Sequence, residues 1–246
     1  MPERLHKHQS KRINYGADTA ASHAMPIFRH DGAIYLFAHV PKSGGSTVEH
    51  GLQDAGIKMS FLDADWLGPN VPDWNRSSPQ HVPRNVLARL FDPDFFDHSF
   101  AFMRDPVDRF LSAFNFNRSL GHIPRRQGLR RFLDRLERSD NHFENRFDNH
   151  FLPADRIVPE TCTIFHLENG FAPLSDWLRK TSGGSLSVDF GHHNKFAPPA
   201  PERPKGLIDA IVSDASEIRQ VTADMLDRET REWICELYAE DYKRFY

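Results

Sequence analysis

The sequence predicts an α/β fold, a three-layer α/β/α arrangement around a central, mostly parallel sheet. Three apolar runs of strand length, at residues 33–40, 99–103 and 161–167, each precede a segment with helical periodicity. Strands that alternate with helices are typical of parallel sheets. The 246 residues suffice for one such domain with a substantial core. We expect this domain over residues 31–246, after a polar, flexible N-terminal arm over residues 1–30.

The first strand leads into a glycine turn that carries a lysine and several hydroxyls. Its sequence is Pro41-Lys42-Ser43-Gly44-Gly45-Ser46-Thr47. A strand, a glycine loop and a helix start together point backbone N–H groups and a positive helix end at one spot, which favours phosphate binding. In a Walker loop the lysine follows the second glycine. Here Lys42 precedes both glycines, so the loop is not of the ATPase type; a plain strand–helix turn is the alternative.

The segment after this loop has the marks of a helix. Ser46 or Thr47 can cap its N-terminus, and Val48, Leu52 and Ala55 recur at helical spacing. Gly56 can end it in the left-handed conformation.

The second strand, residues 99–103, ends in Arg104-Asp105-Pro106. Pro106 suits a first helical turn, and the packed face of the predicted helix is Val107, Phe110, Leu111 and Phe114. Ser112 lies about two turns along, so Arg104 and Ser112 can meet at one anion, for which the planar arginine fork is well suited. An ion pair of Arg104 with a neighbouring aspartate is the alternative.

The rest of the chain follows the same alternation. Residues 128–138 predict a short amphipathic helix, a helix is expected around 174–178, and residues 229–242 predict a last helix. The Pro-, Asn- and Ser-rich stretch 68–83 and the Gly/Pro-rich stretch 183–204 predict loops.

Composition excludes several classes of protein. The formal net charge of −3 shows no basic excess of the kind that nucleic-acid binding needs. No segment approaches the roughly 20 apolar residues of a membrane helix, and no secretory signal is visible. The two cysteines have neither metal nor disulfide spacing. We therefore expect a cytoplasmic protein without a membrane span. The oligomeric state is left open.

Together, the two motifs resemble those of the sulfotransferases that use 3′-phosphoadenosine 5′-phosphosulfate (PAPS), particularly the branch of carbohydrate O-sulfotransferases. Residues 41–47 resemble the family loop that holds the 5′-phosphosulfate. Residues 104–112 resemble the segment that holds the 3′-phosphate, with the same order and offset. The resemblance is sharp over these segments and diffuse elsewhere, from about residue 33 to the C-terminus. It implies a P-loop-like fold. The expected lack of a membrane span departs from the anchored animal members of this branch and suggests a soluble, bacterial-type member.

The resemblance also implies roles for the loop residues. PAPS is the expected donor, and no metal is expected. Lys42 would stabilise the charge on the leaving phosphate, helped by preorganised N–H groups. The donor-binding residues are then Lys42, Ser43, Gly44, Gly45, Ser46, Thr47, Arg104 and Ser112. Lys195, in a late polar loop, could pair with a phosphate or be a solvated lysine.

The catalytic base has two main candidates. Relatives place a catalytic histidine between the first helix and the Arg104 strand, where His81 stands, and imidazole titrates near neutrality. Other members of the wider family use a glutamate just after the loop, where Glu49 stands. His150 and His193 are further candidates. Asp148 and His150 are also expected to line the acceptor site, although a hydrogen bond that stabilises their loop is an equal alternative.

Two other classes of function stay open: a nucleotide kinase or other phosphotransferase on a similar scaffold, and a catalytically inert nucleotide-binding module. The acceptor is expected to offer a free hydroxyl, and the resemblance favours a carbohydrate. The residues do not distinguish a polysaccharide from a lipid-linked sugar, a small alcohol or a peptide tyrosine.

Overall fold

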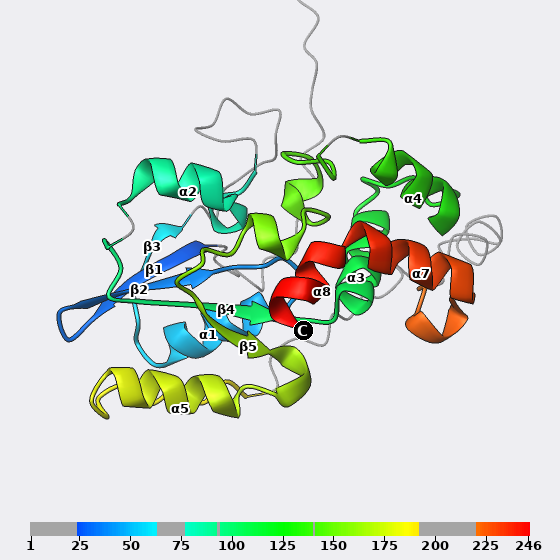
Figure 1. The fold of residues 1–246 in the computed structure, drawn as a ribbon. Coiled ribbons are helices and arrows are strands. Elements are labelled where there is room, and N and C mark those ends of the chain that lie inside the picture. The colour runs from blue at the N-terminus through cyan, green and yellow to red at the C-terminus, as the bar shows by residue number, and fades with distance from the viewer. Residues whose placement is uncertain (1–23, 63–76, 93, 140, 192–219) are drawn as a thin grey trace, which may run out of the picture.

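The protein is built around one five-stranded sheet (Figure 1). The computed structural model describes residues 24–62, 77–92, 94–139, 141–191 and 220–246. The strands lie in the order β3-β1-β2-β4-β5. β2 pairs in parallel with β4, and β4 with β5, whereas β1 is antiparallel to both β2 and β3. Four of the five strands therefore run in one direction, which confirms the predicted mostly parallel sheet. The strand bounds are β1 Ala24–His30, β2 Ala33–Ala38, β3 Met59–Leu62, β4 His98–Met103 and β5 Thr163–His166.

β1 corrects the expected extent of the N-terminal arm. Residues 24–30 form a strand of the sheet and pair with β2 from Ile27↔Leu36 to His30↔Ala33. The connecting turn has positive φ at both Asp31 (47°) and Gly32 (89°). Asp-Gly in this conformation matches the right-handed twist of a two-residue hairpin. Residues 1–23 lie outside the described residues.

Helices cover both faces of the sheet, as a three-layer fold requires (Figure 1). α1 (Gly45–Asp54) and α5 (Ala172–Thr181) pack on one face, against Tyr35, Phe37 and Phe100. α2 (Arg84–Leu90) packs on the other face, where Leu87 contacts Ile27 and Leu36. Because successive side chains of a strand point to opposite faces, β2 supplies aromatic residues to one layer and Leu36 to the other.

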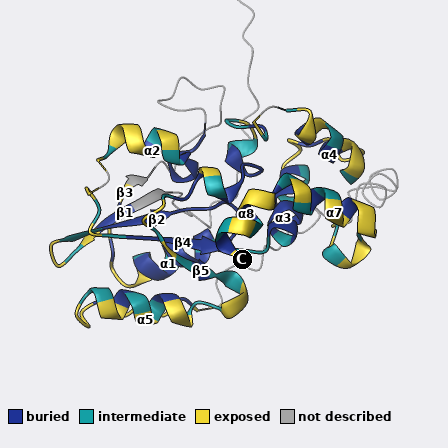
Figure 2. Cartoon of the chain, viewed as in Figure 1, coloured by how far each residue is buried: buried dark blue, intermediate teal, exposed yellow. Residues whose placement is uncertain are grey.

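A separate group of helices lies beside the sheet, toward the ends of β2 and β4 (Figure 1). It consists of α3 (Pro106–Ser119), α4 (Leu129–Glu137) and α7 (Arg228–Leu237). The helices share their own apolar core, in which Phe110, Phe114 and Phe132 are almost fully buried. Figure 2 shows the buried face of α3 turned inward, whereas α4 exposes its outer face. The predicted packed face of α3 is thus confirmed, as are the helices near 128–138 and 174–178.

The last predicted helix, residues 229–242, is two helices instead of one. α7 ends at Leu237, and α8 (Ala239–Phe245) begins after a break at Tyr238, whose φ and ψ are −116° and 28°. The Tyr238 hydroxyl donates a hydrogen bond of 2.8 Å to the Phe151 carbonyl. This buried contact holds Tyr238 in the helical group, while α8 turns away toward Val158 and Leu152.

Short 3₁₀ helices account for much of the remaining chain. η1 (Pro79–His81) stands at the end of the predicted 68–83 loop, which otherwise falls largely outside the described residues. The others are η2 Phe147–Asn149, η3 Ala154–Arg156, η4 Leu167–Asn169 and η5 Ala223–Met225. Within the described part of the chain, no helix is long and apolar enough to span a membrane.

Candidate active site

The glycine loop leaves β2 and turns directly into α1. Lys42 has a φ of 66° and Gly44 a φ of 90°, so both occupy the left-handed region. Gly44 is the N-cap, and the helix begins at Gly45. Ser46 and Thr47 were expected to cap the helix, but they lie inside its first turn. The first N–H groups of a helix lack intrahelical partners and favour an anion. The strand, loop and helix start are thus arranged as expected, and phosphate binding by the loop stays a prediction.

The ring of His39 packs against this loop at Gly45. A Cβ atom added at Gly45 would lie 1.9 Å from Nε2 of His39, so only glycine fits at position 45 with His39 in place. Nδ1 of His39 lies 2.9 Å from Oε1 of Glu49 on α1. Glu49 is only 3% exposed. Its carboxylate is thus buried beside His39, and the His39 ring centroid in turn lies 4.8 Å from that of His81.

Lys42 is largely buried and lies against an aromatic ring. Its Nζ lies 3.7 Å from the centroid of the Phe116 ring on α3. Burial, together with the charge of Arg104, lowers the pKa of Lys42 to about 8. The effect of Arg104 on this pKa means that the two cations lie close enough to repel each other, although they follow different strands.

Three of the predicted donor residues meet at one cavity, whose lining does not include residues 43–47. Lys42, Arg104 and Ser112 line a cavity of about 210 Å³. They converge because the parallel register of β2 and β4 brings the loops that follow these strands to the same edge of the sheet. Asp105 fixes the start of α3, because its Oδ1 accepts hydrogen bonds from the N–H groups of Val107 (2.9 Å) and Asp108 (3.1 Å). Among the described residues Arg104 forms no ion pair, so the alternative pairing with an aspartate is not seen.

Several cavity residues were not predicted from the sequence. Asn115 and Phe116 contribute from α3, and residues 220–223 form another wall. The Asn115 side chain ties this wall to α3, because it donates to the Val221 carbonyl (2.8 Å) and accepts from the Val221 N–H (2.9 Å). No motif marks this pairing, which joins segments more than a hundred residues apart.

His81 stands on η1, where a carboxylate orients its ring. Nδ1 of His81 lies 2.8 Å from Oδ2 of Asp148 and 3.3 Å from Oγ of Ser78. Ser78 also donates to Asp148 through its N–H (2.6 Å) and its hydroxyl (2.8 Å). Burial raises the pKa of Asp148, but the charge and hydrogen bond of His81 outweigh that effect and lower the pKa to about 2. The ionised carboxylate therefore accepts the Nδ1 proton, which leaves Nε2 as the ring atom that can accept a further proton.

The chain reaches Asp148 through an unusual turn. Phe147, Asp148 and Asn149 are three consecutive non-glycine residues in the left-handed region, with φ of 51°, 54° and 56°. Such residues cost of order 1–3 kcal/mol each and cluster at functional sites. Asn149 offsets this cost, because its side chain donates to the His81 carbonyl (2.7 Å) and accepts from the Asn145 N–H (2.7 Å). The turn is thereby fixed to the segment that carries His81.

His150 follows this turn and lies beside His81. Their ring centroids are 5.4 Å apart, and the Phe116 ring lies 5.3 Å on another side of His150. Nδ1 of His150 lies 3.0 Å from Nδ2 of Asn117 on α3. Burial, followed by the charge of His81, holds the pKa of His150 well below its usual range.

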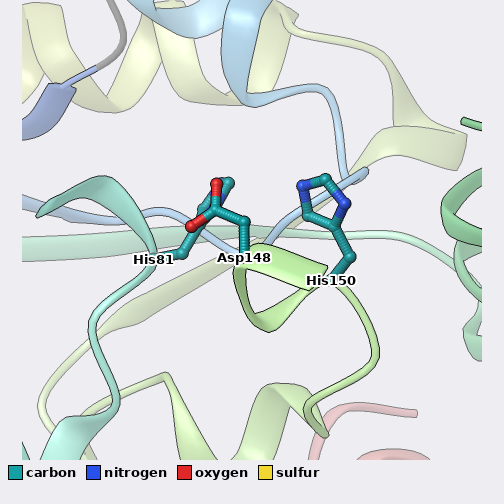
Figure 3. A group of neighbouring side chains, drawn as sticks. All are labelled: His81, Asp148 and His150. Carbon is teal, nitrogen blue, oxygen red and sulfur yellow. The ribbon is translucent and has the colours of Figure 1, made fainter. Parts of the chain in front are cut away.

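His81, Asp148 and His150 thus form one cluster, in which ligand atoms from the three residues lie within 4.8 Å of one another (Figure 3). Such a set could hold a metal ion or act as a hydrogen-bond network around a base. The sequence prediction that Asp148 and His150 act at one site stays a prediction. The structure adds that Asp148 contacts His81 directly. Lys195 and His193 lie outside the described residues.

Comparison with known proteins identifies the family. No curated protein and no solved structure gave a significant match. The model of the sulfotransferase family matches residues 27–246, which is almost the whole chain and includes the loop, the Arg104 segment and the histidine cluster. The chain belongs to the sulfotransferase family.

Proposed function

We propose that the protein transfers the sulfuryl group of PAPS to a hydroxyl of an acceptor, with a carbohydrate as the favoured acceptor class. The observation that carries this proposal is the cavity lined jointly by Lys42, Arg104 and Ser112. Lys42 comes from the loop that precedes α1, whereas Arg104 and Ser112 come from the segment after β4. Two separated anionic groups of one nucleotide would suit this arrangement.

We assign a role in donor binding or in charge stabilisation to each of these residues. The N–H groups at the start of α1, with the Ser46 and Thr47 hydroxyls, hold the 5′ side of the donor. Ser43 supports this role, because its Oγ is buried with no hydrogen-bond partner among the described residues. Arg104 and Ser112 hold the 3′-phosphate. Lys42 meets the oxygen that becomes charged as the sulfur–oxygen bond of the donor breaks.

His81 is the proposed base. The acceptor oxygen forms a bond to sulfur, the bond from sulfur to the donor phosphate breaks, and the hydroxyl proton passes to Nε2 of His81. Asp148 keeps the ring oriented and stabilises the imidazolium that forms. Glu49 is the weaker candidate because its carboxylate is paired with His39, whereas Nε2 of His81 has no hydrogen-bond partner among the described residues. The reaction proposed here uses no metal ion.

Two measurements test this function. Calorimetry should show that 3′-phosphoadenosine 5′-phosphate binds far more tightly than AMP or ATP. Labelled PAPS should then transfer its sulfuryl group to a member of an acceptor panel of methyl pyranosides, a linear oligosaccharide, an alkyl alcohol and a tyrosine peptide, without added Mg²⁺. Equal affinity for nucleotides with and without the 3′-phosphate would overturn the assigned pocket. Mg²⁺-dependent phosphoryl transfer from ATP would favour a kinase, and binding without any turnover would favour an inert module.

A further inference from the structure

The ring of His150 is held by a side chain whose own orientation is fixed. Nδ2 of Asn117 lies 2.9 Å from the Ala113 carbonyl and 3.0 Å from Nδ1 of His150. A carbonyl oxygen only accepts hydrogen bonds, so the atom facing it must be the amide nitrogen. On the other side, Oδ1 of Asn117 lies 3.3 Å from Nδ1 of His122, which can donate to it. Both contacts require the same orientation of the amide.

This orientation determines the tautomer of His150. The second N–H of the Asn117 amide points at Nδ1 of His150, which must accept and therefore carries no proton. A neutral imidazole has one proton, which then resides on Nε2. Burial is the main reason that the pKa of His150 is lowered and its ring stays neutral, and the charge of His81 acts in the same direction. Asp148 raises this pKa, and Lys42 and His39 lower it by smaller effects.

The protonated nitrogen faces the proposed reaction site. Figure 3 shows one ring nitrogen of His150 directed toward Asp148 and His81 and the other directed away. Since Nδ1 is bound to Asn117, the nitrogen that faces the cluster is Nε2. Within the described part of the chain, Nε2 of His150 has no hydrogen-bond partner, and neither does Nε2 of His81. One site thus contains a proton acceptor and, beside it, a neutral donor.

We propose that His150 is a fixed neutral donor, whose Nε2–H binds an acceptor oxygen next to the hydroxyl that His81 deprotonates. This inference rests on the proposed function and adds a rule for the acceptor. Hydrogen bonds of about 2.8 Å from each ring suit two oxygens on neighbouring carbons. The ring separation of 5.4 Å is compatible with such a pair. The favoured substrate therefore carries a second oxygen next to the reacting hydroxyl, as a pyranoside does and a simple alkyl alcohol does not.

The same tautomer argues against a metal ion in the cluster. A metal ligand must offer a lone pair, and a ligating histidine normally donates its other N–H to an acceptor. Here the other nitrogen of His150 meets the N–H of Asn117, so Nε2 keeps its proton. The short distances within the cluster are then those of a hydrogen-bond network.

The tautomer can be measured without turnover. In the full chain labelled with ¹⁵N-histidine, two-bond ¹H–¹⁵N correlations should show His150 as the neutral Nε2–H form at pH 7. The signal is assigned by its absence from His150→Gln, or from His150→Phe if the first variant does not fold. Added Zn²⁺ should leave this signal in place. Asn117→Asp supplies a carboxylate instead of an N–H and should shift the proton to Nδ1.

Three results would overturn the inference: a neutral Nδ1–H form, a protonated ring at pH 7, or displacement of the Nε2 proton by Zn²⁺.

The expected second oxygen on the acceptor is tested separately, by kinetics with the panel member that is sulfated fastest. His150→Gln keeps an N–H donor and should stay within about threefold of wild type in acceptor KM, whereas His150→Phe should raise it about tenfold. Equal effects of the two variants would overturn the donor role. If no panel member is sulfated, the proposed function fails, but the tautomer result still stands or falls separately.

Discussion

Nδ1 of His81 lies 2.8 Å from Oδ2 of Asp148, a residue 67 positions further along the chain. The contact joins η1 to the left-handed turn that precedes His150 and gives His81 the proton arrangement that a general base needs. Asp148→Asn should therefore lower turnover by about 10²–10⁴-fold, because the ring loses its orienting carboxylate. Calorimetry with 3′-phosphoadenosine 5′-phosphate should show unchanged donor affinity. Turnover close to wild type would contradict the orienting role.

The same carboxylate makes a pH-dependent contribution to stability. The pKa of Asp148 is lowered from 3.8 to about 2 in the folded protein. A group with a depressed folded-state pKa stabilises the fold above its unfolded pKa, and this contribution disappears as the pH falls through the folded value. The pH dependence of unfolding between about 4 and 2 should therefore be shallower in Asp148→Asn. Identical urea midpoints at every pH for both proteins would argue against the shift.

Lys42 should limit activity at alkaline pH. Its pKa of about 8 means that the free enzyme loses this charge as the pH rises past that value, so kcat/KM should fall on the alkaline side. Lys42→Ala should reduce turnover by about 10²-fold or more, the scale for losing a preorganised charge partner. Lys58→Ala, at an exposed lysine between α1 and β3, is the control and should leave the profile unchanged.

Arg104 should set the preference for a 3′-phosphate. Arg104→Ala removes the cation that shares the cavity with Ser112. The variant should lose most of its affinity for 3′-phosphoadenosine 5′-phosphate but bind AMP nearly as the wild type does. Arg179→Ala, at an exposed site on α5, provides the control for a general loss of positive charge. A uniform loss of affinity for both nucleotides would place Arg104 elsewhere on the donor.

Gly45 should tolerate no side chain while His39 occupies its present position. Gly45→Ala would bring a Cβ atom within 1.9 Å of the His39 ring, so the ring or the loop must move. We expect weaker donor binding and a lower unfolding temperature. Gly128→Ala is a matched control, because a Cβ there meets nothing within 4 Å. A double-mutant cycle with His39→Ala should show clear coupling; simple additivity would contradict the contact.

The convergence of Lys42, Arg104 and Ser112 could be predicted from the sequence, because parallel strands end at one edge of the sheet and each motif follows an apolar run. The hairpin of β1 could also have been found, since Asp31-Gly32 is a strong turn signal. The break at Tyr238 could not, because it depends on a hydrogen bond to Phe151 that only the folded chain provides.

The partners of the two histidines were also beyond sequence reasoning. Asp148 reaches His81 through three consecutive left-handed residues, none of them glycine. Asp and Asn adopt this conformation more often than other non-glycine residues, but no local pattern predicts three in a row. Asn117 resembles any polar residue of an amphipathic helix, and its role appears only where α3 meets the segment after Asp148. Phe116 likewise has the sequence pattern of a core residue, yet its ring contacts both Lys42 and His150.

The choice of base is tested most directly by the rate of sulfuryl transfer from labelled PAPS in His81→Ala and Glu49→Gln, measured at saturating donor. We predict that His81→Ala keeps donor affinity, loses about 10²–10⁴-fold in rate and loses the acidic limb of the pH–rate profile. Glu49→Gln should stay within a fewfold of wild type, because its carboxylate is paired with His39. Abolished turnover in Glu49→Gln, with His81→Ala within a fewfold of wild type, would make the glutamate the base and contradict the proposed mechanism.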